Sequence, residues 1–273
     1  MLKNIFKMAF VGLLAFTFAA CTDNEKKETK NTVEEKKTVI KVGATPVPHS
    51  EILEVVKPLL KAKGYDLEIV EFTDYVTPNI AVDEGELDAN FFQHVPYLTE
   101  FNANKNTNLV KTVNVHLEPM GLYSNKIKTL SELKDGASIA VPNDPTNESR
   151  ALDMLVKEGL MTFNDVALKT AVDIKDNPKN IKIKELDAPQ LPRVLDEVDA
   201  AIINTNYALA ANLNPLRDAL LIESKDSPYA NIVAVKAGNE NTDYIKALNE
   251  AINSPEVKAF IKEKYNGSIV EAF

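Results

Sequence analysis

Cysteine is almost absent from this sequence, which has one such residue, Cys21, and no tryptophan in 273 positions. A single cysteine excludes an intramolecular disulfide framework and every zinc site built on a cysteine pair. The sequence also has no serine–histidine–aspartate arrangement typical of hydrolases, no glycine-rich phosphate loop and no HExxH motif. We therefore expect a protein that is not an enzyme and that holds no cofactor.

Histidine is scarce as well, with only His49, His94 and His116 in the chain. No two of them have the His-x-x-x-His spacing of a helical metal site, and the sequence has no histidine-rich loop. A site made of His49, His94 and a carboxylate such as Asp74 is the competing interpretation. The spacing of the three histidines therefore argues against a metal site.

Positive charge is in deficit, because 31 lysines and arginines face 40 acidic residues and give a formal charge of −9. Without Lys3 and Lys7, the only charged residues among the first 20, the charge becomes about −11. An acidic body argues against nucleic acid or anionic lipid as the main partner. The hydrophobic content of 45% is that of an ordinary soluble protein, and beyond the N-terminal segment no apolar run is long enough to cross a membrane.

A short apolar run stands directly before the lone cysteine. Two lysines precede the run Met8–Ala20, which is the layout of a secretory signal peptide over 1–20. The residues Phe-Ala-Ala-Cys at 18–21 resemble the bacterial lipobox, with phenylalanine where leucine is commoner. The resemblance implies cleavage before Cys21 and attachment of acyl chains such as palmitate to it. A secreted protein with one free thiol is the alternative.

The segment after this cysteine is built almost entirely of threonine, asparagine, glutamate and lysine, with Val33 as its one large apolar residue. Such a composition cannot bury enough surface to fold. We expect residues 21–38 to be a lipidated cysteine followed by a disordered tether, because stable anchoring needs more than one acyl chain.

From Val39 onward, strand patterns alternate with helix patterns. Residues 39–45 alternate and are rich in β-branched side chains, and a helix pattern follows from Ser50 until Gly64. A serine cap before Pro255 predicts another helix from Ser254 to Tyr265. Strands alternating with helices predict α/β architecture with parallel sheets, and ligands of such sheets bind at the carboxyl ends of strands. The loops to inspect are therefore 46–49, 73–77, 92–97, 142–150 and 204–207.

About 235 residues remain after the tether, which is long for one core and suits two lobes. Two long extended segments near 110–123 and 220–235 are candidates for paired crossovers between them. They predict a discontinuous first lobe of 39–118 plus 232–273 and a second lobe of 119–231. The expected architecture is the two-lobed fold of periplasmic binding proteins, with a ligand cleft between lobes that close by a hinge.

Six segments of the chain, several of them in the loops after predicted strands, resemble the MetQ/NlpA family of lipoproteins, the methionine-binding receptors of ABC importers. The resemblance extends from Val39 to the C-terminus, in the order and spacing of the family. The segments are Phe72–Asn79, Asp88–Tyr97, Val141–Asn147 with Arg150, Asp176–Asn180 leading to Glu185–Arg193, Ile203–Ala208 and Ser227–Asn231.

A free amino acid needs partners for its carboxylate and its ammonium group. Arg150, near the start of a helix, suits a carboxylate because its planar fork donates two hydrogen bonds. A surface pairing with a nearby acid is the alternative, and the resemblance favours ligand contact. Asn204 and Asn147 can donate to a carboxylate and accept from an ammonium group, although asparagine at such places often only caps or turns the chain.

The resemblance further implies that Tyr75, Phe92, His94 and Tyr97 line a pocket for the ligand's side chain, where a thioether gains contact with aromatic rings. Core packing is the alternative for Phe92 and Tyr97. Phe91 alternates to the other side of its strand and is expected in the core. His49 lies in a loop that we expect to face the same cleft.

The resemblance implies a monomeric, lipid-anchored receptor in the bacterial cell envelope that binds L-methionine and delivers it to a membrane permease powered by an ATPase. D-methionine, a methionine-containing dipeptide and another amino acid are alternative ligands. A metal-binding receptor or an adhesin is a further alternative.

Overall fold

The computed structural model describes residues 37–224 and 227–273, which belong to one compact unit. The signal peptide predicted over 1–20, Cys21 and nearly all of the predicted tether lie outside the described residues. Among the helices of the described part, none is long and apolar enough to cross a membrane.

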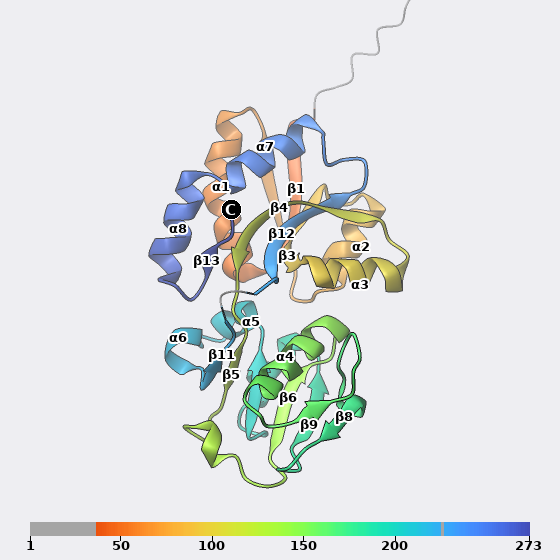
Figure 1. The fold of residues 1–273 in the computed structure, drawn as a ribbon. Coiled ribbons are helices and arrows are strands. Elements are labelled where there is room, and N and C mark those ends of the chain that lie inside the picture. The colour runs from red at the N-terminus through yellow and green to blue at the C-terminus, as the bar shows by residue number, and fades with distance from the viewer. Residues whose placement is uncertain (1–36, 225–226) are drawn as a thin grey trace, which may run out of the picture. The chain divides into compact units, whose positions relative to one another are not determined.

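A six-stranded sheet, the first sheet, has the strand order β13-β4-β12-β3-β1-β2 (Figure 1). Strands β1, β2 and β3 are parallel, whereas β12 pairs antiparallel with β3 and β4, and β13 pairs antiparallel with β4. Their bounds are β1 Val39–Ala44, β2 Asp66–Glu71, β3 Ala89–His94, β4 Leu109–Leu117, β12 Ala230–Lys236 and β13 Val270–Glu271.

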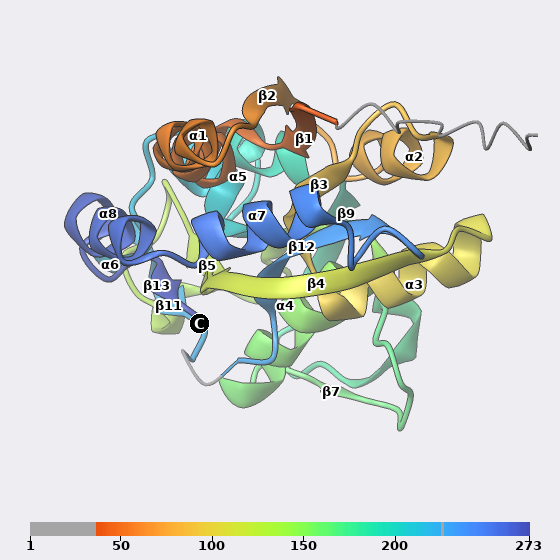
Figure 2. The ribbon, with the colours of Figure 1, turned by 90° about the horizontal axis from the view of Figure 1, so that it is seen from above.

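Helices cover both faces of the first sheet. Residues Val233 and Val235 of β12 enter the core shared with α1 (Glu51–Ala62), α7 (Asp243–Ile252) and α8 (Pro255–Tyr265). Their neighbours Ile232 and Ala234 enter the core under α2 (Thr77–Glu84) and α3 (Val95–Lys105). Figure 2 shows α1 and α8 on one side and α2 and α3 on the other. The two-residue period of the strand therefore supplies both layers of the core.

Helix boundaries follow the local sequence. In α1 the buried residues Ile52, Val56 and Leu60 recur at helical spacing, and the helix gives way to Gly64 with φ +84°. Only glycine adopts such a backbone without strain. The predicted helix near the C-terminus is confirmed as α8, where the Ser254 hydroxyl accepts from the Val257 amide at 3.3 Å.

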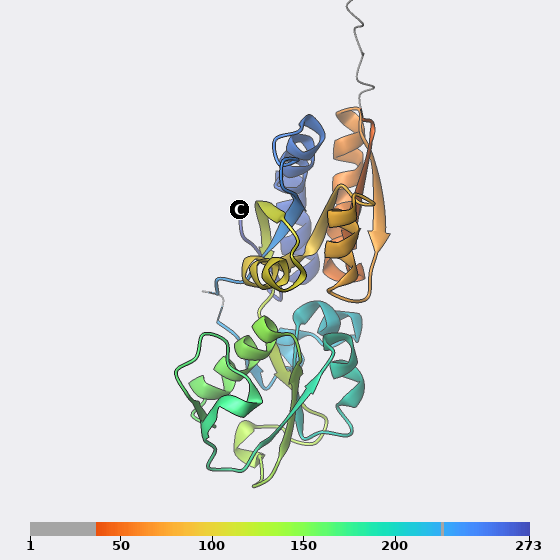
Figure 3. The same ribbon diagram turned by 90° about the vertical axis from the view of Figure 1, so that its right-hand side faces the viewer.

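A five-stranded sheet, the second sheet, has the order β11-β5-β10-β6-β9. Alternate residues of β10 pack beneath α4 (Pro145–Lys157) on one face and against α5 (Thr205–Ala210) and the 3₁₀ segment Ala188–Val194 on the other (Figure 3). The strands are β5 Gly121–Tyr123, β6 Ser138–Pro142, β9 Lys182–Leu186, β10 Ala200–Ile203 and β11 Leu221–Ile222. The short elements β7 Thr162–Phe163, β8 Ile174–Asp176 and α6 Pro215–Asp218 complete this half.

The chain passes between the sheets twice, from β4 to β5 and from β11 to β12. Both passages fall within the extended segments expected near 110–123 and 220–235. The sheets are mixed rather than wholly parallel, because strands at the passages enter against the direction of their neighbours. The boundaries of the two lobes stay a prediction, and β12 already begins at Ala230.

Candidate functional site

Loops from both sheets enclose a small polar space of about 340 Å³, counting its open mouth. Tyr75 follows β2, His94 ends β3, Asn147 follows β6 and Asn204 follows β10. The carboxyl ends of parallel strands lie at one edge of a sheet, which explains why these separate loops meet. The lining consists of Tyr75, Phe92, Gln93, His94, Tyr97, Glu118, Asn147, Arg150, Asn204, Thr205, Asn206 and Asn231.

Every site residue predicted from the sequence lies in this lining except His49. The His49 side chain is only 1% exposed and lies behind the lining, where it contacts Glu118 and Asn231. Phe91 is fully buried in the core of the first sheet, which confirms the expected alternation with Phe92.

Three aromatic side chains form one wall of the space. The ring centroids of Tyr75 and Phe92 are 5.8 Å apart, and those of Tyr75 and Tyr97 are 5.9 Å apart. The Tyr97 hydroxyl donates to the Tyr75 carbonyl at 2.8 Å, and the Tyr75 hydroxyl donates to Oδ1 of Asn206 at 2.6 Å. Because Asn206 belongs to α5, this last bond joins the aromatic wall to the second sheet's half of the protein.

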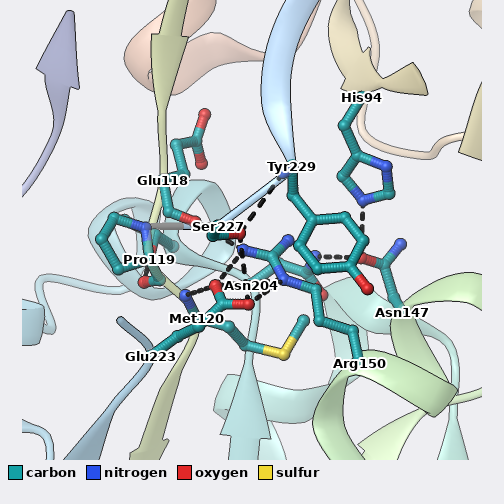
Figure 4. A network of polar contacts seen from close by, with 11 residues as sticks. His94, Glu118, Pro119, Met120, Asn147, Arg150, Asn204, Glu223, Ser227 and Tyr229 are labelled. Carbon is teal, nitrogen blue, oxygen red and sulfur yellow. Dashed lines mark hydrogen bonds and ion pairs between the residues drawn. The ribbon is translucent and has the colours of Figure 1, made fainter. Parts of the chain in front are cut away.

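A chain of amides connects His94 to Asn204 (Figure 4). Nδ1 of His94 accepts from the Tyr97 amide, so its Nε2 carries the proton and donates to Oδ1 of Asn147 at 3.2 Å. The same Oδ1 accepts from Nδ2 of Asn204 at 2.9 Å, and Nδ2 of Asn147 donates to Asp144. The polar atoms of Asn147 are therefore all paired, whereas Oδ1 of Asn204 is buried without a hydrogen-bond partner.

Arg150 is held in place by its own protein partners (Figure 4). Its Nε donates to Glu223 at 3.0 Å, its Nη2 pairs with the same carboxylate, and Nη2 also donates to the Glu118 carbonyl at 2.8 Å. The ring of Tyr229 lies 4.4 Å from the guanidinium carbon. Among the hydrogen bonds of the described residues, none uses Nη1 of Arg150.

Behind Arg150, a buried carboxylate meets two imidazoles. Nε2 of His116 lies 2.7 Å and Nε2 of His49 lies 3.2 Å from Oε1 of Glu118. Nδ1 of His49 lies 2.7 Å from the Thr45 hydroxyl. Burial raises the pKa of Glu118, opposed by His49, by Arg150 and by the Asn206 amide that donates to the carboxylate. The cluster joins the segment after β1, which holds Thr45 and His49, to the end of β4 and to α5.

All three histidines should stay neutral in the folded protein at mildly acidic pH. Burial lowers the pKa of His49 to about 4, that of His94 to about 3, with the charge of Arg150 adding to the effect, and that of His116 to about 3. An unfolded imidazole binds its proton near pH 6.5, so its contribution to stability is complete above that pH and is lost as the pH falls toward these values. We expect NMR titration of the ring protons to show no midpoint above about pH 5. A midpoint near 6.5 for any histidine would contradict this burial.

The sequence interpretation missed several lining residues. Glu118 lies on a crossover between sheets rather than in a loop after a parallel strand, and Asn231 stands at the start of β12. Asn231 belongs to the segment Ser227–Asn231, whose resemblance to the family is a sequence signal for this residue. Glu118 gave no signal, because only tertiary folding brings it beside two distant histidines.

His49, His94 and Asp74, the residues of the competing metal interpretation, do not come together as a set of ligands in the structure. His94 is paired with Asn147, and Asp74 accepts from the Val76 and Thr77 amides of its own turn. In the described part of the chain, the one group of three potential ligands within 4.8 Å is His49, His116 and Glu118. The distances from the two imidazole nitrogens to Oε1 of Glu118, 3.2 and 2.7 Å, lie in the range of ordinary hydrogen bonds.

Comparison with known proteins gives consistent results. The family model described as NlpA lipoprotein matches residues 40–273. The methionine-binding lipoprotein MetQ of Bacillus subtilis strain 168 is 43% identical over 277 residues, covering 98% of each chain. The D-methionine-binding lipoprotein MetQ of Salmonella typhi is 41% identical over 270 residues, covering 97% of this chain and 96% of that protein. A solved structure of a nutrient binding protein from Burkholderia cenocepacia bound to methionine is 48% identical with a TM-score of 0.84, covering 86% of this chain and all of that one.

Two sheets joined by crossovers, with a polar site between them, define a substrate-binding protein of the periplasmic type, as the sequence predicted. The extent of the family match makes the assignment specific. This chain belongs to the NlpA lipoprotein family, a family of envelope-associated lipoproteins.

Proposed function

We propose that this protein is a lipid-anchored receptor that encloses L-methionine and delivers it, chemically unchanged, to an ABC permease and its ATPase. The observation that carries the proposal is one small space in which a buried arginine, an unpaired amide oxygen and aromatic rings meet. These groups match the carboxylate, the ammonium group and the thioether side chain of methionine.

Each part of the ligand has a partner of suitable chemistry. The free Nη1 edge of Arg150 binds the carboxylate, and the Asn204 carbonyl oxygen accepts from the ammonium group. Tyr75, Phe92, His94 and Tyr97 enclose the thioether, while Asn147 positions His94 and Asn204, and His49 supports the lining from behind. Burial of the side chain contributes only about 2–3 kcal/mol, so the polar contacts must supply much of the affinity.

The ligand enters when the two lobes open. We propose lobes of 39–118 plus 232–273 and of 119–231, with the two passages between sheets as the hinge. The arrangement is supported by the sheets, since the first sheet draws its strands from the outer segments and the second from the middle one. The hydrogen bond from Tyr75 to Asn206 and that from the Tyr207 hydroxyl to the Thr73 carbonyl hold the lobes together.

The proposed anchor is a set of acyl chains on Cys21, followed by a tether that holds the binding protein, a monomer, outside the cytoplasmic membrane. Its support is the lipobox-like sequence at 18–21 and the lipoprotein names of the relatives. The named D-methionine-binding relative makes D-methionine the alternative ligand.

Mass spectrometry of the full chain, extracted in detergent from bacterial membranes, tests anchor and ligand together. Under denaturing conditions we expect the mass of residues 21–273 plus acyl groups, and under native conditions an adduct that is released at the mass of methionine. Chiral chromatography of the released compound distinguishes L-methionine from D-methionine.

Other outcomes would contradict the proposal. A released metal ion would favour the metal-binding interpretation and direct attention to His49, His116 and Glu118. No adduct, together with no thermal shift at methionine concentrations far above a plausible Kd, would exclude methionine as the ligand. An unmodified Cys21 would exclude the anchor.

A further inference from the structure

The charges around the site do not balance without a ligand. Among the lining residues that the structure describes, Arg150 is the one permanent cation and Glu118 is the one carboxylate. Arg150 is already paired with Glu223, a second buried carboxylate just outside the lining. Glu118 therefore has no permanently charged cation of its own as a partner among the lining residues.

The groups that hold Glu118 are neutral donors. Nε2 of His49 must carry its proton, because it lies 3.0 Å from Oδ1 of Asn231, which can only accept. Nδ1 of His116 is buried without a partner, and a bare lone pair is less costly there than an orphaned N–H, so its proton is also on Nε2. His116 thus donates to the carboxylate at 2.7 Å, and the backbone amide of Asn206 is a second donor. The His49 proton is directed at Asn231, and Nε2 of His49 lies 3.2 Å from the carboxylate.

Glu118, Asn204 and Asn231 all line the space and carry acceptor oxygens. Oδ1 of Asn231 and Oε1 of Glu118 lie 3.0 and 3.2 Å from the same imidazole nitrogen of His49. Asn204 adds a buried carbonyl oxygen that has no donor among the residues the structure describes. A lining that holds a buried anion and an unpaired acceptor favours a ligand that brings both positive charge and several N–H donors.

We infer that Glu118 is a specificity-determining residue that binds the ammonium group of the ligand, opposite the carboxylate held by Arg150. The inference rests on the proposed function and narrows it. The site then requires a free primary ammonium group, as in methionine or at the N-terminus of a short peptide, and rejects the same compound without its amino group. His49 and His116 orient the carboxylate from behind.

Calorimetric titration with two ligands tests this inference. The ligands are methionine and 4-(methylsulfanyl)butanoate, which is methionine without its amino group. Glu118→Gln keeps the size of the side chain but removes its charge. We expect this variant to bind methionine about 10- to 100-fold more weakly and to bind the des-amino compound within about 3-fold of the wild type.

The matched control is Glu148→Gln, which removes another largely buried carboxylate that contacts the Ala171 amide and does not line the site. It should leave both affinities unchanged. The wild type provides an independent arm that needs no variant, since it should prefer methionine over the des-amino compound by at least about 10-fold.

The outcomes separate the inference from the proposed function. Equal loss of both ligands in Glu118→Gln, or equal affinity of the wild type for both, overturns the role of Glu118 while methionine binding stands. A wild type that binds no methionine overturns the proposed function and this inference with it.

Discussion

Replacement of Arg150 by alanine should weaken methionine binding by at least about 100-fold, because a buried carboxylate would lose its charge-assisted partner. Arg150 is only 4% exposed and lines the space between the sheets. Arg150→Lys should recover little of the affinity, since a single ammonium nitrogen cannot replace Nε and Nη2 on Glu223 and the Glu118 carbonyl and also reach the ligand. Calorimetric titration measures both effects.

Arg150→Ala should also lower the free energy of unfolding. Glu223, whose side chain is 7% exposed, would lose its partner, and an uncompensated buried charge costs about 3–5 kcal/mol. The double variant Arg150→Met with Glu223→Gln removes both charges and should fold more stably than Arg150→Ala while still failing to bind. Arg217→Ala is the matched control, because Arg217 is exposed and, within the described part of the chain, its ion pair is with the neighbouring Asp218. Unchanged methionine affinity in Arg150→Ala would refute the assignment.

Truncation of Phe91 to alanine should lower the free energy of unfolding by about 3–5 kcal/mol. Phe91 is completely buried in β3, and its ring forms T-shaped contacts with the His49 and His116 imidazoles at centroid distances of 4.6 and 5.3 Å. The cavity would therefore remove packing from the core and from the imidazoles that hold Glu118. Chemical denaturation followed by circular dichroism measures the change.

Phe273→Ala is the control for this substitution, because Phe273 is 40% exposed at the C-terminus and should change stability by less than about 0.5 kcal/mol. Similar midpoints for the two alanine variants would mean that Phe91 is not part of a tightly packed core. A large loss confined to Phe91→Ala, with methionine binding retained at low temperature, would separate the structural role of Phe91 from that of its neighbour Phe92.

Local patterns predicted the features that depend on local physics. The alternation in β1, the spacing of buried residues in α1 and the serine cap of α8 each follow from a few neighbouring residues. The aromatic wall and Arg150 were found because loops after strands converge in an α/β fold, and because those loops resemble a known family. His49 was placed in the lining, but its ring turns toward Thr45 and lies one layer behind.

The direction of several strands could not be deduced in the same way. Apolar alternation shows that residues 230–236 form a strand, but it does not tell whether that strand runs with or against its neighbours. The direction of β12 is decided by the passage from the second sheet, which delivers the chain between β3 and β4 from the opposite end.

From composition and short-range spacing, the sequence by itself determined the acidic charge and the α/β class and predicted the signal peptide. The anchor and the aromatic and arginine residues of the site were predicted from the resemblance of short segments to known lipoproteins. Only the tertiary structure decided that Glu118 meets His49 and His116, that Arg150 pairs with Glu223, and that Asn204 keeps a free oxygen. Those contacts join residues far apart in the chain. Their charges and hydrogen bonds become defined only when both sheets have folded and water has been excluded between them.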